Sequence, residues 1–203
     1  MMTHHMSRSV GRVTVAQVAP AAWTLGEIAG RLVEVSGAGA AAVLTAAFGL
    51  VLEAQRVGEP VAWVTPKESS FYPPDAVESG IDLDALVVIR VSDFRDVGRA
   101  ADRLARSGAF GLIVLDLGAA VVPTPLQARL AGLARKHHAA LLCLTEKERG
   151  ALSLGPLISL RVHARRARGS GSEFACELTA LKDKRRGLGW SHEEVCRGPV
   201  GLR

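Results

Sequence analysis

The chain has 203 residues, enough for one domain with a sizeable core. Hydrophobic residues make up 48% of it and aromatic residues only 4%, which predicts an aliphatic core and excludes a disordered or a disulfide-stapled protein. The net charge of +5 arises in the C-terminal fifth: residues 161–203 hold 10 Lys and Arg against 5 Asp and Glu, which leaves 15 of each sign for residues 1–160. This asymmetry indicates a polyanionic or acidic partner for that segment, or else a solvated basic surface.

The sequence predicts a cytoplasmic protein with no membrane partner. No segment holds about 18 uninterrupted apolar residues, and the first residues lack the apolar core of a signal peptide. The three cysteines, Cys143, Cys176 and Cys196, are widely spaced and odd in number, which argues against a disulfide framework. Cys143 lies in an apolar run, where a buried reduced thiol is expected.

Apolar periodicity predicts helices and strands that alternate after an irregular arm over residues 1–22. The expected helices cover residues 23–28, 40–56, 74–79, 95–106 and 126–137. The expected buried strands cover residues 31–35, 61–64, 86–91, 111–116 and 140–144. Continuous apolar strands that alternate with helices are typical of a parallel sheet covered on both faces.

The C-terminal segment has a different pattern. Residues 158–166 and 174–181 alternate between apolar and polar side chains, and the connection between them contains GSGS. This pattern predicts an antiparallel hairpin at one edge of the sheet. Residues 23–203 are therefore expected to form a single α/β domain with a mostly parallel central sheet and an antiparallel C-terminal hairpin.

The loop SGAGA after the first strand occupies the place of a phosphate-binding loop. The P-loop pattern is GxxxxGK[ST], in which glycines expose backbone N–H groups, the Lys supplies positive charge and the hydroxyl holds magnesium. Counted from Gly37, the second glycine, the lysine and the hydroxyl are replaced by Ala42, Val43 and Leu44. A triphosphate with about three to four negative charges would meet only a helix dipole of about half a charge. We therefore expect no bound nucleotide.

No other candidate site rises above background. Asp116 ends an apolar strand as in a Walker B motif, but Leu44 replaces the second magnesium ligand, so a carboxylate that caps a local loop is favoured. His137 and His138 point about 100° apart at a helix end, where positive side chains are favourable, and suit no single metal ion. No catalytic triad is visible, and we expect no enzymatic activity, metal or other cofactor.

The sequence resembles the RecA core from residue 31 to the C-terminus. The segment LVEVSGAGAAAVLTAAFGLVLEAQRVGEPVAWV is similar to its first strand, P-loop, helix and second strand without a gap. The following helix and turn are similar to PPDAVESGIDLDAL, and the Walker B region is similar to ADRLARSGAFGLIVLDLGAAV, with Asp116 in register. The resemblance implies a RecA-like three-layer α/β/α core.

Three departures from RecA concern its chemistry and assembly. Lys67, with Glu68 beside it, takes the position of the glutamate that polarises the attacking water, which inverts the charge that a general base needs. Only TEKERGALS replaces a long DNA-binding loop, and Glu146 takes the place of the nucleotide-sensing glutamine. The N-terminal helix and strand through which RecA protomers grip their neighbours are reduced to the arm before Trp23.

A RecA-like core without a working P-loop resembles the ImuA family of bacterial mutagenesis proteins, which is also grouped with SulA-like proteins. This resemblance implies a non-catalytic accessory role in DNA-damage-induced translesion synthesis. The implied partners are an ImuB-type homologue of Y-family polymerases, which is bound directly, and an error-prone C-family polymerase, which is reached indirectly. The alternatives are an active RecA-like ATPase or recombinase, for which Lys67 is the one well-placed lysine, and a SulA-like inhibitor of cell division.

The resemblance also implies a protein-binding surface. In RecA-fold proteins a neighbour's strand docks beside the third core strand and places an apolar anchor against the following helix. The matching residues here are Val87, Val88, Ile89, Val91, Phe94, Val97, Ala101 and Leu104. An unpaired strand edge can recruit an extended partner segment, and simple core packing is the alternative.

Basic side chains of the C-terminal segment form the second expected surface. They are Arg161, Arg165, Arg166, Arg168, Lys182, Lys184, Arg185 and Arg186. Contacts with the phosphate backbone of DNA need positive charge but no base readout. In RecA a Lys-x-Lys that matches Lys182 and Lys184 reaches the nucleotide of the neighbouring protomer. We expect DNA contact here, and a solvated or partner-facing edge is the alternative.

Overall fold

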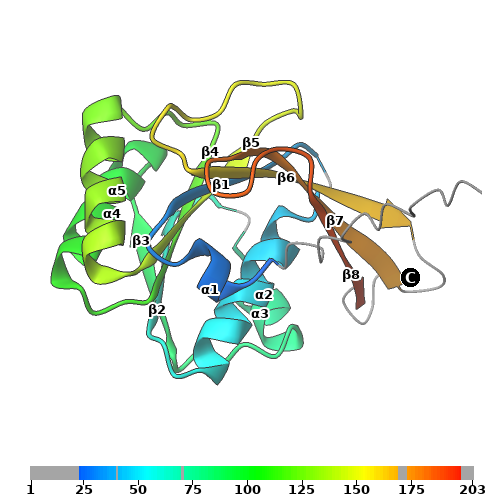
Figure 1. Ribbon diagram of the computed structural model, residues 1–203. Helices are drawn as coiled ribbons and strands as arrows, with labels where there is room; N and C mark the ends of the chain where they lie inside the picture. Colours follow the sequence, from blue (N-terminus) through cyan, green and yellow to red (C-terminus); the bar gives the residue numbers. More distant parts are fainter. Residues whose placement is uncertain (1–22, 40, 70, 169–172, 198–203) are drawn as a thin grey trace, which may run out of the picture.

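The computed structural model describes residues 23–39, 41–69, 71–168 and 173–197, and the predicted arm over residues 1–22 lies outside them. The described residues form an eight-stranded sheet in the order β3-β2-β4-β5-β1-β6-β7-β8, with helices on both faces (Figure 1). The strands are β1 Leu32–Gly37, β2 Val61–Pro66, β3 Leu86–Val91, β4 Leu112–Gly118, β5 Ala140–Glu146, β6 Leu160–Arg168, β7 Glu173–Asp183 and β8 Ser191–Arg197. The helices are α1 Leu25–Ile28, α2 Val43–Arg56, α3 Pro73–Glu78, α4 Phe94–Ser107 and α5 Thr124–His137.

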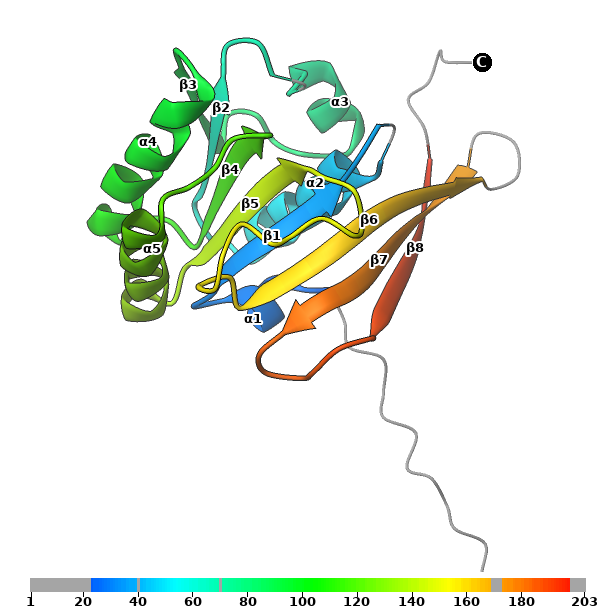
Figure 2. The same ribbon diagram turned by 90° about the horizontal axis from the view of Figure 1, so that it is seen from above.

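Different helices bury the two faces of the sheet. One core cluster joins α1, α2 and α3 to the sheet and contains Ile28, Phe48 and Ala76. The other joins α4 and α5 to the opposite face and contains Val97 and Leu130. Figure 2 shows α4 and α5 together on one side of the sheet. The apolar strands β1, β2, β4 and β5 are buried between these layers, which confirms the predicted α/β fold.

The strand pairing brings several strand ends to one edge. The strands from β3 to β6 pair in parallel, so the carboxyl ends of β1, β2, β4 and β5 lie at the same edge of the sheet. In open α/β sheets this edge is where ligands bind. The loops that leave it are therefore the first place to look for a functional site.

The antiparallel C-terminal part is larger than the sequence predicted. β6 and β7 form the expected hairpin, and β8 adds a third strand at the end of the sheet opposite β3 (Figure 2). The sequence of β8, SHEEVCR, has a single aliphatic residue, Val195, whose side chain is exposed. Apolar periodicity therefore could not reveal this strand, because it is held by backbone pairing rather than by a buried face.

Two further sequence expectations concern thiols and membranes. Cys143 in β5 is a buried free thiol, as predicted, and burial raises its pKa well above the ordinary value. Cys176 is also a buried free thiol and Cys196 a half-buried one. None of the described helices has the length and apolar character needed to cross a bilayer.

Candidate functional site

A cavity of about 350 Å³ lies at the carboxyl edge of the sheet, between the SGAGA loop and the ends of β4 and β5. It is lined by Gly37, Gly39, Ala41, Val43, Leu44, Glu68, Ser69, Phe94, Asp116, Gly118, Leu144, Thr145 and Glu146. This lining contains three carboxylates and no lysine, arginine or histidine. We call this cavity the carboxyl-edge cleft.

Gly37 and Gly39 of the SGAGA loop occupy positions that favour glycine, whereas the lysine of a phosphate loop is missing. A Cβ atom on Gly37 would lie 2.5 Å from the Cβ of Ala41 and 2.8 Å from a methyl of Val43, so only glycine fits there. Gly39 has φ +60°, a conformation that L side chains rarely adopt. The helix α2 begins at Val43, so an aliphatic side chain stands at the position where a P-loop has its lysine.

Asp116 is a buried carboxylate that forms no ion pair with the described residues. The residue is only 8% exposed, and its Oδ2 accepts a hydrogen bond of 3.0 Å from the Thr65 hydroxyl. Burial raises the pKa of Asp116, although hydrogen bonds from the Thr65 and Ser69 hydroxyls and from the N–H of Gly118 oppose the rise. The expected capping role of Asp116 agrees with these contacts.

Two glutamates extend the negative charge across the cleft. Glu68 follows β2 and Glu146 ends β5, and both side chains are exposed. Among the described residues, none of Glu68, Asp116 and Glu146 forms an ion pair. Lys67, the one well-placed lysine by sequence, is exposed and does not line the cleft. The cleft lining therefore lacks the positive side chain that a P-loop places against the phosphates.

The three carboxylates also do not form a metal centre. Within the described part of the chain, no three His, Cys, Asp or Glu side chains lie close enough together to hold one ion. From the sequence, helix geometry predicts that His137 and His138 do not bind one metal ion together. Both histidines lie at the end of α5, just before β5 begins at Ala140, so they are at the edge of the sheet opposite the cleft. His138 takes the left-handed conformation of a helix C-cap.

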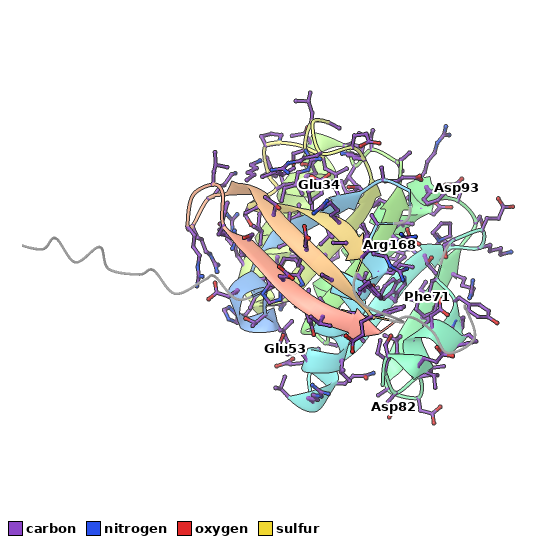
Figure 3. All side chains as sticks on the ribbon, turned by 90° about the vertical axis from the view of Figure 1, so that its right-hand side faces the viewer. Glu34, Glu53, Phe71, Asp82, Asp93 and Arg168 are labelled. Carbon is purple, nitrogen blue, oxygen red and sulfur yellow. The ribbon has the colours of Figure 1, made fainter. Side chains whose placement is uncertain are left out.

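A buried ionic cluster supports the loop that follows β5. Glu34, in the middle of β1, is fully buried, and four donors contact its carboxylate at 2.8–3.1 Å: Thr145 Oγ1, Lys147 Nζ, Ser153 Oγ and the backbone N–H of Leu154. In Figure 3, Glu34 lies where β1 passes beneath this loop. Arg161 approaches Glu34 to 3.9 Å and donates to the carbonyls of Glu148 and Ala151.

The position of Arg161 corrects one sequence prediction. Arg161 is only 4% exposed, and its guanidinium is occupied by Glu34, the Ser36 hydroxyl and loop carbonyls. It therefore belongs to the protein interior and cannot contact DNA phosphates. The sequence prediction grouped Arg161 with the other basic residues of the C-terminal segment, whereas in the fold the carbonyls of the loop after β5 bond to it.

The remaining basic residues fall into two groups. The basic residues near the end of β7 bond to other parts of the chain. Lys182 donates to the carbonyl of Gly155 and Lys184 to that of Pro156. Arg185 donates to the carbonyls of Glu27 and Ala29, and Arg186 pairs with the Glu27 side chain. On the hairpin they are exposed. Arg165 pairs with Glu177 at 2.7 Å, Arg166 lies 4.0 Å over the Phe174 ring, and Arg168 is at the end of β6 (Figure 3).

The predicted protein-binding surface at β3 is also only partly accessible. Within the described residues β3 pairs with β2 alone, so its outer edge is open. Val87 is 47% exposed. Five other residues of the predicted surface, on β3 and α4, are half-buried: Val88, Ile89, Val91, Phe94 and Leu104.

Two residues of that predicted surface belong to the core. Val97 and Ala101 have no exposed surface and pack between α4 and the sheet. They cannot receive an anchor without a rearrangement of α4, and an arginine at Ala101 would disrupt the fold itself. Phe94 has a second role that the sequence did not reveal, because it lines the carboxyl-edge cleft and packs against Gly118.

In a comparison with known protein families, residues 8–143 match the RecA N-terminal domain family. The chain is similar to Protein RecA of Nocardioides sp., with 40% identity over 94 residues that cover 46% of this chain and 27% of that relative. It is also similar to Protein RecA of Fusobacterium nucleatum subsp. nucleatum, with 37% identity over 94 residues, 46% of this chain and 25% of the relative. The matched segment thus spans about a quarter of the length of these relatives.

The buried carboxylate generates a prediction about stability. Because the pKa of Asp116 is raised in the folded protein, the unfolded chain loses this proton first, from about pH 3.9 upward. Stability then falls as the pH rises through the folded pKa and stays lower at neutral pH. We expect Asp116→Asn to raise the free energy of unfolding at pH 7, with a smaller gain at pH 4, as measured by urea denaturation.

The exposed Asp84 offers a control with the same change of charge. Asp84→Asn is expected to leave the free energy of unfolding within about 0.5 kcal/mol of the wild type at both pH values. A loss of stability in Asp116→Asn at pH 7 would show that the carboxylate is stabilising in this position.

Proposed function

The chain belongs to the RecA N-terminal domain family, and we propose that it is a non-catalytic member that acts as an adaptor in DNA-damage-induced translesion synthesis. Its direct partner is an ImuB-type polymerase homologue, and an error-prone C-family polymerase is reached through that partner. The observation that carries the non-catalytic part is the carboxyl-edge cleft, whose lining has three carboxylates and no cation.

Electrostatics supports the absence of nucleotide chemistry. Two like charges 4 Å apart repel by about 4 kcal/mol at the effective dielectric constant of about 20 that suits sites near a protein surface. A triphosphate at the SGAGA loop would approach Asp116 and Glu68 without the lysine that offsets such repulsion in a P-loop. The hydroxyl that would hold magnesium is replaced by Leu44. Binding and hydrolysis of ATP are both disfavoured by this arrangement.

The open edge of β3 supports the partner role. A strand edge with unpaired N–H and C=O groups binds an extended segment through backbone hydrogen bonds, and neighbouring apolar side chains give specificity. Here Val87, Ile89 and Leu104 flank the open edge from the strand and from α4. The partner supplies the strand that pairs with β3.

The hairpin arginines support a DNA contact of limited size. Arg165, Arg166 and Arg168 are exposed on one strand, and Arg166 and Arg168 lie on the face that carries Phe174. An arginine stacked on an aromatic ring keeps its N–H groups free for phosphate oxygens. Lys182, near the end of β7, and Lys184, Arg185 and Arg186 after it bond to the α1 region or to the carbonyls of residues 155 and 156, so the proposed contact does not include them.

The non-catalytic proposal is tested by calorimetric titration with magnesium ATP. We expect no saturable binding up to about 1 mM nucleotide. A dissociation constant above this concentration corresponds to less than about 4 kcal/mol of binding free energy. Protein RecA of Nocardioides sp., titrated under the same conditions, is the positive control. Micromolar affinity of this chain for ATP would contradict the proposal and favour an active ATPase.

The partner proposal is tested by pull-down with an ImuB-type polymerase homologue. Val87→Asp and Ile89→Asp place a carboxylate at the open edge and are expected to weaken binding about tenfold or more, because a charge there would be desolvated. Val195→Asp, on the edge strand at the opposite end of the sheet, is the control and should bind as the wild type does.

Unchanged binding in both β3 variants would place the partner site elsewhere. A parallel pull-down with the cell-division GTPase addresses the SulA-like alternative. Binding to that GTPase but not to the polymerase homologue would contradict the translesion role.

The DNA contact is tested by the salt dependence of single-stranded oligonucleotide binding. Each phosphate contact contributes a slope of about 0.7 to the fall of log K with log salt. We expect the double variant Arg166→Gln/Arg168→Gln to lower that slope by about 1.4. The control Lys184→Gln/Arg186→Gln removes two exposed charges that bond within the chain and should leave the slope nearly unchanged. Equal slopes for the wild type and the Arg166→Gln/Arg168→Gln variant would exclude the hairpin.

A further inference from the structure

The carboxyl-edge cleft has the chemistry of a receptor for a positively charged group. Its walls are apolar where Val43, Leu44 and Leu144 line it, and its polar groups are the carboxylates and the hydroxyls of Ser69 and Thr145. Asp116 is more than nine-tenths buried at one side of the cleft and has only neutral hydrogen-bond partners among the described residues. An ionised carboxylate in such a place is stabilised strongly by a cation that enters the same cavity.

The spacing of the acidic groups favours an extended cation over a metal ion. No three candidate metal ligands of the described chain converge on one point. Glu68 comes from the loop after β2, Asp116 from β4 and Glu146 from the end of β5, so the negative charge surrounds the cavity rather than one centre. A planar guanidinium has five N–H donors directed to different sides and can pair with more than one carboxylate.

The two loops that follow the cleft-lining ends of β4 and β5 are tied to one another. The loops that leave Gly118 and Glu146 are joined by Gln127, whose amide nitrogen donates to the carbonyls of Val122 and Leu154 at 2.7 and 2.9 Å. Each loop has one large exposed aliphatic side chain, Val121 at 80% and Leu152 at 88%.

The buried Glu34 cluster holds the second of these loops in place. Ser153 and the N–H of Leu154 bond to Glu34, and Lys147 bonds both to Glu34 and to the carbonyl of Leu152. Leu152 is therefore exposed on a backbone that is fixed on both sides. A fixed, exposed aliphatic residue on the loop that follows the cleft-lining Glu146 is suited to an apolar contact that flanks a basic side chain.

We propose that the carboxyl-edge cleft binds an arginine side chain of a protein partner, which inserts between Glu68, Asp116 and Glu146 while aliphatic neighbours contact Val121 and Leu152. The guanidinium is favoured over an ammonium because Phe94 lines the same cavity and offers a ring on which a planar cation stacks. This site is separate from the β3 edge, and it rests on the proposal that the cleft does not take nucleotide.

The test uses two blocked tripeptides that differ only in charge. N-acetyl-Leu-Arg-Leu-amide is the probe, and the same peptide with citrulline in place of arginine is its neutral isostere. Both are titrated into the full ¹⁵N-labelled chain and followed by amide chemical shifts. We expect saturable shifts at residues that line the cleft, such as Leu44 and Thr145, with the arginine peptide, and at least tenfold weaker binding with the citrulline peptide.

Matched variants assign the effect to the cleft. Glu68→Gln/Glu146→Gln removes two exposed charges that form no ion pair among the described residues, so the fold is expected to persist. This variant should bind the arginine peptide at least tenfold more weakly than the wild type. The control Glu193→Gln/Glu194→Gln removes the same net charge from β8 and should bind like the wild type.

Four results would overturn the proposal. Equal binding of the arginine and citrulline peptides would show that charge is irrelevant, and equal binding of the wild type and the Glu68→Gln/Glu146→Gln variant would place the site elsewhere. Saturable shifts of the cleft amides by magnesium ATP would overturn both this proposal and the non-catalytic function. Absence of binding by both peptide and nucleotide would overturn the arginine site alone.

Discussion

The buried carboxylate of Glu34 is the interaction on which the carboxyl edge of this protein depends. It lies in the central strand β1, and its partners come from β5, from β6 and from the loop between these strands. Removal of one member of such a cluster leaves a buried charge unpaired, which typically costs about 3–5 kcal/mol. The loop after β5 covers residues 147–159, and it is bonded to this cluster at Lys147, Ser153 and Leu154. A loop fixed in this way can present a defined surface to another protein.

The sequence predicts the parallel core well because burial is the dominant signal there. Runs such as residues 111–116 have no polar residue until their end, and such runs become central strands whatever the loops do. The errors occur where local pattern and tertiary packing disagree. Arg161 belongs to a basic stretch by sequence, yet the loop after β5 covers it and Glu34 neutralises it. Ala101 matches an anchor position in the RecA-like pattern, yet it is core because α4 packs directly on the sheet there.

The site could be predicted only in part for a similar reason. Counting from Gly37 reveals that the P-loop lysine and hydroxyl are absent, because those positions are adjacent in sequence. The negative charge of the cavity lining can be predicted only when the order of the strands in the sheet is known. Glu68 and Glu146 are distant in the chain, and they line one cavity because β2 and β5 end at the same edge of the sheet. Phe94 was assigned to the β3 surface, whereas its side chain also closes the cleft against Gly118.

The strand order separates the proposed contacts from one another. β3 and β6 are five strand spacings apart in the sheet, which is about 24 Å at roughly 4.8 Å per spacing. A strand bound beside β3 therefore leaves the arginines of the β6–β7 hairpin accessible to DNA. The carboxyl-edge cleft lies between these two surfaces, at the ends of β4, β5 and β1. Val43 in place of the phosphate lysine leaves a cleft lining with three carboxylates and no positive side chain. Under the two proposals made for this cleft, the cavity that takes an anion in a P-loop protein takes a cation here, beside a loop in which Gly37 leaves no room for a Cβ atom.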